Sequence, residues 1–136
     1  MVTLHRRRKG TDGFTLIELM IVMALIVILA GIATAMYVNS IQRSKEAVLK
    51  SDLFRMRDAI DQYYADKNKY PASLEALVSE KYLRSMPVDP ITNSTETWQT
   101  TMSDPEPGNA LAESGVFDVK SGAEGTAIDG SSYSEW

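Results

Sequence analysis

The chain of 136 residues contains no cysteine and one histidine, His5. Without thiols there are no disulfides, thiolate zinc sites or thiol nucleophiles, and a single histidine cannot form a histidine-rich metal or catalytic cluster. The sequence also has no GxGxxG, P-loop or HExxH motif. Its scattered acidic residues are typical of a solvated helix face. We therefore expect a single domain that is not an enzyme.

Basic residues are scarce in the last part of the chain. Residues 87–136 contain one basic residue, Lys120, and nine acidic ones, whereas residues 1–86 contain 13 basic and nine acidic residues. A protein that binds nucleic acid needs lysine and arginine on its folded domain. The charge distribution therefore predicts no nucleic-acid partner, and the basic cluster at residues 5–9 requires another explanation.

The apolar residues are concentrated in one long run. Of the 24 residues from 14 to 37, 20 are apolar. A helix of this length extends about 36 Å, enough to cross a hydrocarbon core of about 30 Å. Basic residues before such a helix hold that end on the cytoplasmic side. The pattern predicts a single-pass membrane helix with the remainder of the chain on the opposite side.

One acidic residue, Glu18, interrupts the apolar run. A carboxylate at the centre of a membrane helix costs about 2.5–3.5 kcal/mol, so such a residue usually has a function and a cationic partner. The apolar run contains no basic residue. Cleavage between Gly13 and Phe14 would create a positively charged α-amino group near Glu18. We predict that an amine of this kind is its partner.

Residues 13–19 read Gly-Phe-Thr-Leu-Ile-Glu-Leu, which resembles the class III leader of type IV pilins and type II secretion pseudopilins. The resemblance implies that a prepilin peptidase cuts after Gly13 and methylates the amino group of Phe14. It implies that Glu18 pairs with an N-terminus during assembly of a homo-oligomeric filament. The expected partners are an inner-membrane assembly platform and minor pseudopilins or pilins, and the C-terminal domain is expected in the periplasm before assembly.

Two other interpretations of the N-terminal segment remain open. An ordinary secretory signal also has a basic start and an apolar core, and Ala33-Thr34-Ala35 provides a cleavage pattern. Its apolar core typically has about 7–15 residues and no glutamate. Alternatively, the segment is a plain membrane anchor in which Glu18 is tolerated.

The helix is expected to continue beyond the membrane, because residues 38–68 contain no proline or glycine. Apolar side chains recur there at three- and four-residue steps, which predicts one buried stripe. The stripe consists of Val48, Leu49, Leu53, Met56, Ile60, Tyr63 and Tyr64. One helix of about 50 residues follows, amphipathic in its second half, and Tyr70-Pro71 is expected to end it.

Shorter elements are predicted after this helix. Residues 74–82 form a helix capped by Ser73, and the prolines of residues 86–90 require a turn. Residues 95–102 and 115–119 are β-prone runs separated by a loop at 103–114. The predicted fold class is α+β, a long helical spine with a small antiparallel sheet, as in pilins. Its parts are a cleaved leader at 1–13, a transmembrane and filament-core helix at 14–37 and a globular domain at 38–136.

Several C-terminal segments also look like the globular signature of major, G-type pseudopilins. They include Lys-Tyr-Pro at 69–71, Pro-Val-Asp-Pro at 87–90 and Gly-Val-Phe-Asp-Val at 115–119. In that family a terminal loop binds calcium through oxygen ligands, which suit this hard cation. Transferred by position, the resemblance implies a carbonyl ligand from Val119 and side-chain ligands from Ser121, Glu124 and Asp129. The alternative is a solvated acidic loop.

Three functions remain in competition at the level of the sequence. The first is a major subunit of the type II secretion pseudopilus, which takes part in protein secretion. The second is the major subunit of a type IV pilus, used in adhesion, motility or DNA uptake. The third is a membrane-anchored binding domain without a filament.

Many type IV pilins close their C-terminal loop with a disulfide, so the absence of cysteine favours the first function. Two differences from the family weaken that assignment. Ala35 stands where the family usually has a proline that kinks the helix. The chain also lacks the insertion that major pseudopilins commonly have between the two helical segments.

Overall fold

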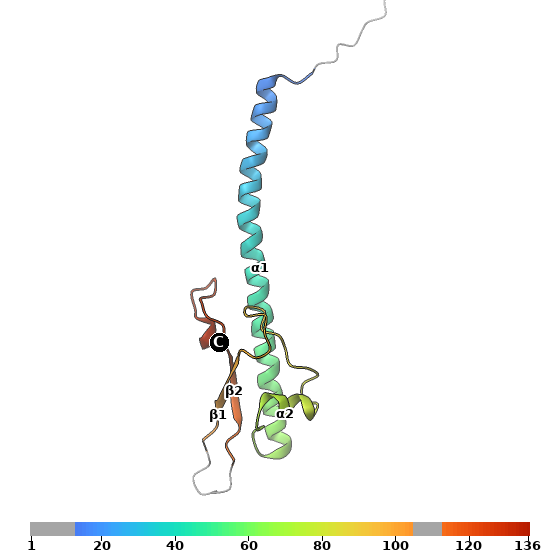
Figure 1. Ribbon diagram of the computed structural model, residues 1–136, viewed down its shortest axis with the longest axis vertical. Coiled ribbons are helices and arrows are strands. Elements are labelled where there is room, and N and C mark those ends of the chain that lie inside the picture. Colours follow the sequence, from blue (N-terminus) through green and yellow to red (C-terminus); the bar gives the residue numbers. More distant parts are fainter. Residues whose placement is uncertain (1–12, 105–112) are drawn as a thin grey trace, which may run out of the picture. The chain divides into compact units, whose positions relative to one another are not determined.

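The computed structural model describes residues 13–104 and 113–136, which divide into two compact units at Asn39 and Ser40. Helix α1 covers Leu16–Lys67 and helix α2 covers Leu74–Ser79 (Figure 1). Strands β1 (Trp98–Met102) and β2 (Val116–Ser121) and the 3-10 helix η1 (Tyr133–Glu135) follow. The long helix and the small antiparallel sheet confirm the predicted α+β pilin fold. Residues 1–12 of the predicted leader and 105–112 of the predicted loop lie outside the described residues.

The first unit contains the N-terminal part of α1. Every side chain from Leu16 to Asn39 is exposed, although most are apolar. Helix α1 is long and apolar enough to cross a membrane. An exposed apolar surface that surrounds a helix on all sides is typical of a segment that meets lipid or other helices rather than water.

Helix α1 ends earlier than Tyr70-Pro71, the predicted stop. Asn68 adopts a positive φ of 53°, and its backbone N–H donates to the carbonyl of Tyr64 at 2.8 Å. Asparagine enters this left-handed conformation more readily than most residues, and one such residue is sufficient to end a helix. The turn at Asn68 therefore ends the helix before the proline can do so.

The core of the second unit forms around one stripe of α1. Helix α1 contributes Leu49, Leu53, Met56, Ala59, Ile60 and Tyr63. The other elements and loops contribute Leu74, Leu77, Trp98, Val116, Val119, Ala123, Ala127 and Tyr133. The stripe is narrower than predicted, since Val48 is 49% exposed and Tyr64 is 39% exposed. The ring of Tyr64 instead stacks on Tyr70, with centroids 4.5 Å apart.

Helix α2 is three residues shorter than predicted. Ser73 occupies the N-cap position but makes no side-chain cap hydrogen bond. At the other end, Lys81 adopts a φ of 68°. The N–H groups of Tyr82 and Leu83 then both donate to the carbonyl of Leu77, at 2.8 and 2.9 Å. This left-handed turn closes the helix at Ser79, so Tyr82 reaches the core from a turn.

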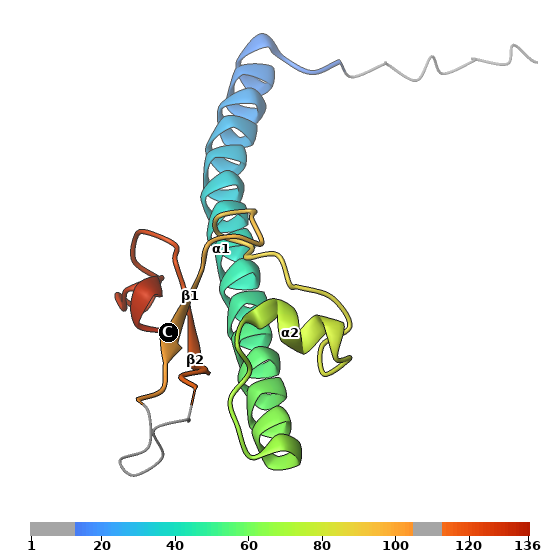
Figure 2. The same ribbon diagram turned by 60° about the horizontal axis from the view of Figure 1, so that its bottom comes forward.

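Strands β1 and β2 pair antiparallel, from Trp98 opposite Ser121 to Met102 opposite Val116, with an irregularity between Thr101 and Met102. Strand β1 starts three residues later than predicted, and β2 continues two residues further. In both views α2 and the two strands lie on different sides of the part of α1 that belongs to the second unit (Figure 1, Figure 2). The sheet thus covers one side of the buried stripe.

Candidate functional site

The predicted processing site lies directly before α1. Gly13 and Phe14 precede the helix, and the Phe14 side chain is 83% exposed. Thr15 caps the helix, because its hydroxyl oxygen accepts from the N–H of Glu18 at 3.3 Å and its carbonyl accepts from Leu19 at 3.1 Å. The Gly13–Phe14 peptide bond is therefore outside the hydrogen-bonded helix.

Glu18 occupies the first turn of α1. Thr15 and Glu18 have the spacing of a capping box, in which a threonine cap is followed three residues later by glutamate or glutamine. A carboxylate near a helix N-terminus also interacts favourably with the helix dipole. Among the ion pairs within residues 13–104 and 113–136, none includes Glu18.

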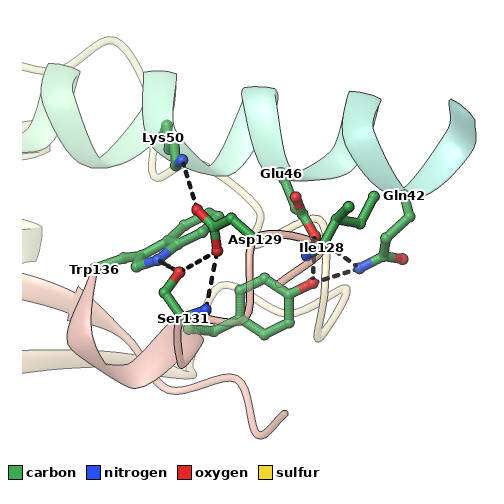
Figure 3. A network of polar contacts seen from close by, with 8 residues as sticks. Gln42, Glu46, Lys50, Ile128, Asp129, Ser131 and Trp136 are labelled. Carbon is green, nitrogen blue, oxygen red and sulfur yellow. Dashed lines mark hydrogen bonds and ion pairs between the residues drawn. The ribbon is translucent and has the colours of Figure 1, made fainter. Parts of the chain in front are cut away.

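A second cluster of polar contacts lies in the globular unit, where the segment at 122–136 packs on α1 (Figure 3). The Glu46 carboxylate accepts from the N–H of Ile128 at 3.0 Å and from the Tyr133 hydroxyl at 2.8 Å. Gln42 also donates to the Tyr133 hydroxyl. Burial, together with the bond to Glu46, raises the pKa of Tyr133 above its ordinary value. The tyrosine is therefore a neutral donor at physiological pH.

Lys50 adds contacts one helical turn further along α1. Its Nζ lies 4.0 Å from the Asp129 carboxylate and 4.1 Å from the ring centroid of Trp136. The Trp136 indole N–H donates to the Ser131 hydroxyl at 2.7 Å (Figure 3). Hydrogen bonds from Ser131 lower the pKa of Asp129 below its ordinary value. Because Lys50 and Asp129 are both well exposed, this ion pair adds little stability and mainly orients the segment.

Three of the four predicted calcium ligands have oxygens that are engaged by contacts within the protein. The Val119 carbonyl accepts from Arg57 at 2.9 Å, and the buried Ser121 hydroxyl donates to Asp89 at 2.6 Å. Asp129 turns its carboxylate to Ser131, and Glu124 is exposed. Within the described residues no three acidic or histidine side chains form a metal-binding group. Calcium binding by Val119, Ser121, Glu124 and Asp129 therefore stays a prediction.

Sequence reasoning missed the residues that hold the globular unit together. The sequence predicts a solvated face for acidic helix residues such as Glu46 and no contact for Gln42 or Arg57, yet each bonds to the C-terminal segment. Asp89 was treated as part of a turn, yet it is fully buried and bonds to Ser121. The available signal was the spacing of residues 42, 46, 50 and 57, which places them on one helix face.

Asp52 carries a pH dependence that can be tested. Burial raises its pKa, Arg55 opposes this and the negative charge of Asp89 adds to it. A folded pKa above the unfolded value gives stability at low pH that is lost as the pH rises past both values. Asp52→Asn removes this loss, so we expect the melting temperature to rise by about 1–3 °C at neutral pH and to match the wild type below about pH 3, where Asp52 is protonated in both states.

The measurement is thermal unfolding of the detergent-solubilised chain at both pH values. Asp58→Asn is the matched control, because Asp58 is exposed on the same helix and accepts one hydrogen bond, from Gln62 at 2.7 Å. A variant at position 52 that melts lower than the wild type at neutral pH would contradict the direction of the shift.

The fold and the N-terminal segment together define a class of protein. An exposed apolar helix follows Gly13-Phe14, carries Glu18 in its first turn and continues into an amphipathic half under a small antiparallel sheet. This combination is that of a pilin-like, membrane-anchored filament subunit.

Comparisons with known proteins agree with this class. The family model for the prokaryotic N-terminal methylation motif matches residues 8–34. The type II secretion system core protein G of Pseudomonas aeruginosa is 33% identical over 100 residues, which cover 62% of this chain and 70% of that protein. The Vibrio cholerae core protein G is 27% identical over 93% of both chains. Fimbrial protein EcpC of Eikenella corrodens is 38% identical over 60% of this chain and 56% of that protein. No solved structure matches significantly.

The chain belongs to the family of type II secretion system core protein G, the major pseudopilins. The motif match at 8–34 includes Gly13, Phe14 and Glu18. Family membership and the apolar part of α1 make the chain a membrane-anchored protein.

Proposed function

We propose that this chain is the structural subunit of a type II secretion pseudopilus, and that it polymerises after its leader is removed at Gly13. The observation that carries the proposal is the match of residues 8–34 to the methylation motif in a chain that belongs to the core protein G family. The relatives are structural proteins rather than enzymes, which supports a mechanical function.

The exposed apolar surface of α1 supports a simple physical mechanism. In the membrane, lipid surrounds the side chains of residues 16–37, all of which are exposed in the single chain. In a filament, helices of neighbouring copies replace the lipid. Glu18 pairs with the Phe14 amine of a neighbour, because neither charge is stable alone in an apolar surrounding. The globular unit covers the filament.

The charge distribution supports the proposed orientation, and the family supports the proposed partners. The basic cluster at residues 5–9 precedes the apolar helix, which favours a cytoplasmic N-terminus and a periplasmic globular unit before assembly. A prepilin peptidase in the inner membrane cleaves and methylates the precursor. An inner-membrane platform and minor pseudopilins then support the assembly of a homo-oligomeric filament in the periplasm.

Intact mass of the protein purified from membranes tests the processing step. We expect the N-terminus at Phe14 with one added methyl group. Cleavage after the Ala33-Thr34-Ala35 pattern would instead give a chain that starts at Met36, and a plain anchor would keep residues 1–13. Either of those masses would contradict the proposal.

A surface type IV pilus is the second candidate, because fimbrial protein EcpC is 38% identical to part of this chain. The matches to several core protein G relatives cover a larger share of those proteins than the match to EcpC covers of that protein. This difference favours the secretion function. Neighbouring genes discriminate between the two candidates. A secretin with other secretion components supports the pseudopilus, whereas a retraction motor with pilus components supports the pilus. Negative-stain images of overexpressing cells without fibres would support an anchored binding domain instead.

A further inference from the structure

The partly exposed guanidinium of Arg57 is bound by oxygens from other parts of the globular unit. Its Nε donates to the Asp118 carboxylate at 2.8 Å, and its Nη2 donates to the carbonyl of Val119 and the main-chain oxygen of Trp136, each at 2.9 Å. The same Asp118 oxygen accepts from the N–H of Val119 at 2.8 Å. Three oxygens from two separate segments therefore converge on one guanidinium.

The acceptors are those that a hard cation would also use. A carboxylate and two main-chain oxygens are typical calcium ligands, and one of them, the Val119 carbonyl, belongs to the set that family resemblance assigned to calcium. Arginine provides a permanent positive charge and several N–H donors in a rigid plane. Its guanidinium already satisfies these oxygens, so a metal ion would have to displace it.

Further contacts from the same face of α1 hold the segment at 122–136. Glu46 holds Ile128 and Tyr133, and Lys50 covers the ring of Trp136. Trp136 packs edge-on against Tyr133, with ring centroids 5.3 Å apart. Each of these groups belongs to the protein itself. The segment is thus attached to α1 at several points that need no metal.

We propose that Arg57 replaces a bound metal ion as the group that holds strand β2 and the segment at 122–136 on helix α1, so that the folding of this segment does not depend on calcium. The proposal concerns the folding of the globular unit and is independent of filament assembly.

Thermal unfolding of the full chain in detergent tests the independence from calcium. We expect the same melting temperature, within about 1 °C, in excess EGTA and in millimolar calcium, because a ligand that does not bind the folded state cannot stabilise it. A melting temperature that calcium raises by more than about 3 °C relative to EGTA would overturn the proposal, because it would show a bound ion in the folded state.

Arg57→Gln tests the guanidinium itself. We expect this variant to melt about 10 °C lower, because three oxygens lose a charged donor. Cleavage by a glutamate-specific protease after the exposed Glu124 reports on the segment locally and should accelerate at least about tenfold. The matched control is Arg55→Gln, because the Arg55 side chain is 72% exposed and forms an ion pair with Asp52, at 3.9 Å, on its own helix. Equal cleavage rates for the variants at positions 55 and 57 would overturn the proposal.

Discussion

Replacing Glu18 with glutamine is expected to abolish filament formation while membrane insertion continues. Insertion persists because the apolar run keeps its 20 apolar residues and loses its one acidic side chain. Assembly fails because the amine of Phe14 loses its negative partner in an apolar filament core. An unpaired buried charge costs about 3–5 kcal/mol, which corresponds to at least about a hundredfold weaker subunit association.

Glutamine is a sharper replacement than alanine at this position. Glu18 lies three residues after Thr15, and the N–H of Glu18 donates to the Thr15 hydroxyl. A capping box accepts glutamine as well as glutamate, so the start of the helix is preserved in Glu18→Gln and only the charge is lost. Filaments sheared from cells are measured by immunoblot and negative-stain microscopy, and insertion by resistance to carbonate extraction.

Thr15→Ala is the matched control for the helix start. It removes the cap hydroxyl at a cost of about 1 kcal/mol and leaves the Glu18 charge in place. We expect it to form filaments, and intact mass measures whether it is still processed at Phe14. Normal filaments from the glutamine variant would refute the pairing of charges. Equal loss of filaments in both variants would show that the helix start, rather than the charge, is required.

The long helix and its membrane segment could be predicted from the sequence because their signals are local. The apolar run at 14–37 and the absence of proline and glycine from 38 to 68 act over a few turns of one element. The end of the helix could not be predicted from the sequence in the same way. A left-handed Asn68 ended it before Tyr70-Pro71, because asparagine enters this conformation at small cost and leaves no periodic signal.

The strands were located correctly, but their limits depend on partners far away in sequence. Strand β2 continues to Ser121 because Ser121 lies opposite Trp98 in the ladder. Near the other end, Val116 and Val119 are both buried, although residues three apart in a regular strand face opposite sides of the sheet. The irregularity in the ladder adds a residue on β2, so Phe117 is exposed and the alternation shifts. Such an extra residue cannot be recognised from the pattern of a single strand.

The contacts of the globular unit could not be predicted, because each joins residues far apart in the chain. Arg57 and Asp118 are 61 positions apart, and Glu46 and Tyr133 are 87 apart. Periodicity shows that such helix residues are not in the apolar stripe, and a solvated face is then the usual outcome. Only the folded chain shows that the sheet and the C-terminal segment meet this polar face as well.

Asp89→Ala is expected to destabilise the globular unit more than any surface change. The Asp89 side chain is fully buried. Its carboxylate accepts from the N–H groups of Ile91 and Thr92 at 2.8 and 3.3 Å and from the Ser121 hydroxyl at 2.6 Å. Alanine leaves three donors without an acceptor. Unsatisfied buried groups cost about 1–3 kcal/mol each, so we expect a total of about 3–5 kcal/mol and a melting temperature at least about 12 °C lower.

Two further variants separate the hydrogen bonds from the charge. Asp89→Asn keeps one acceptor oxygen, so it should lose about half as much stability as alanine. Ser121→Ala removes one donor to the Asp89 carboxylate. The double variant Asp89→Ala/Ser121→Ala should lose less stability than the two single variants lose in sum, because each single change leaves the other group unpaired.

Glu96→Ala is the surface control, because Glu96 is exposed and follows the same turn. The measurement is thermal unfolding of the full chain in detergent, followed by circular dichroism. Melting of the Asp89→Ala variant within about 2 °C of the control would show that the turn at 87–94 and strand β2 do not depend on each other through this carboxylate. We expect the opposite, because Asp89 is the one buried side chain among the described residues that is acidic, and it bonds to both segments.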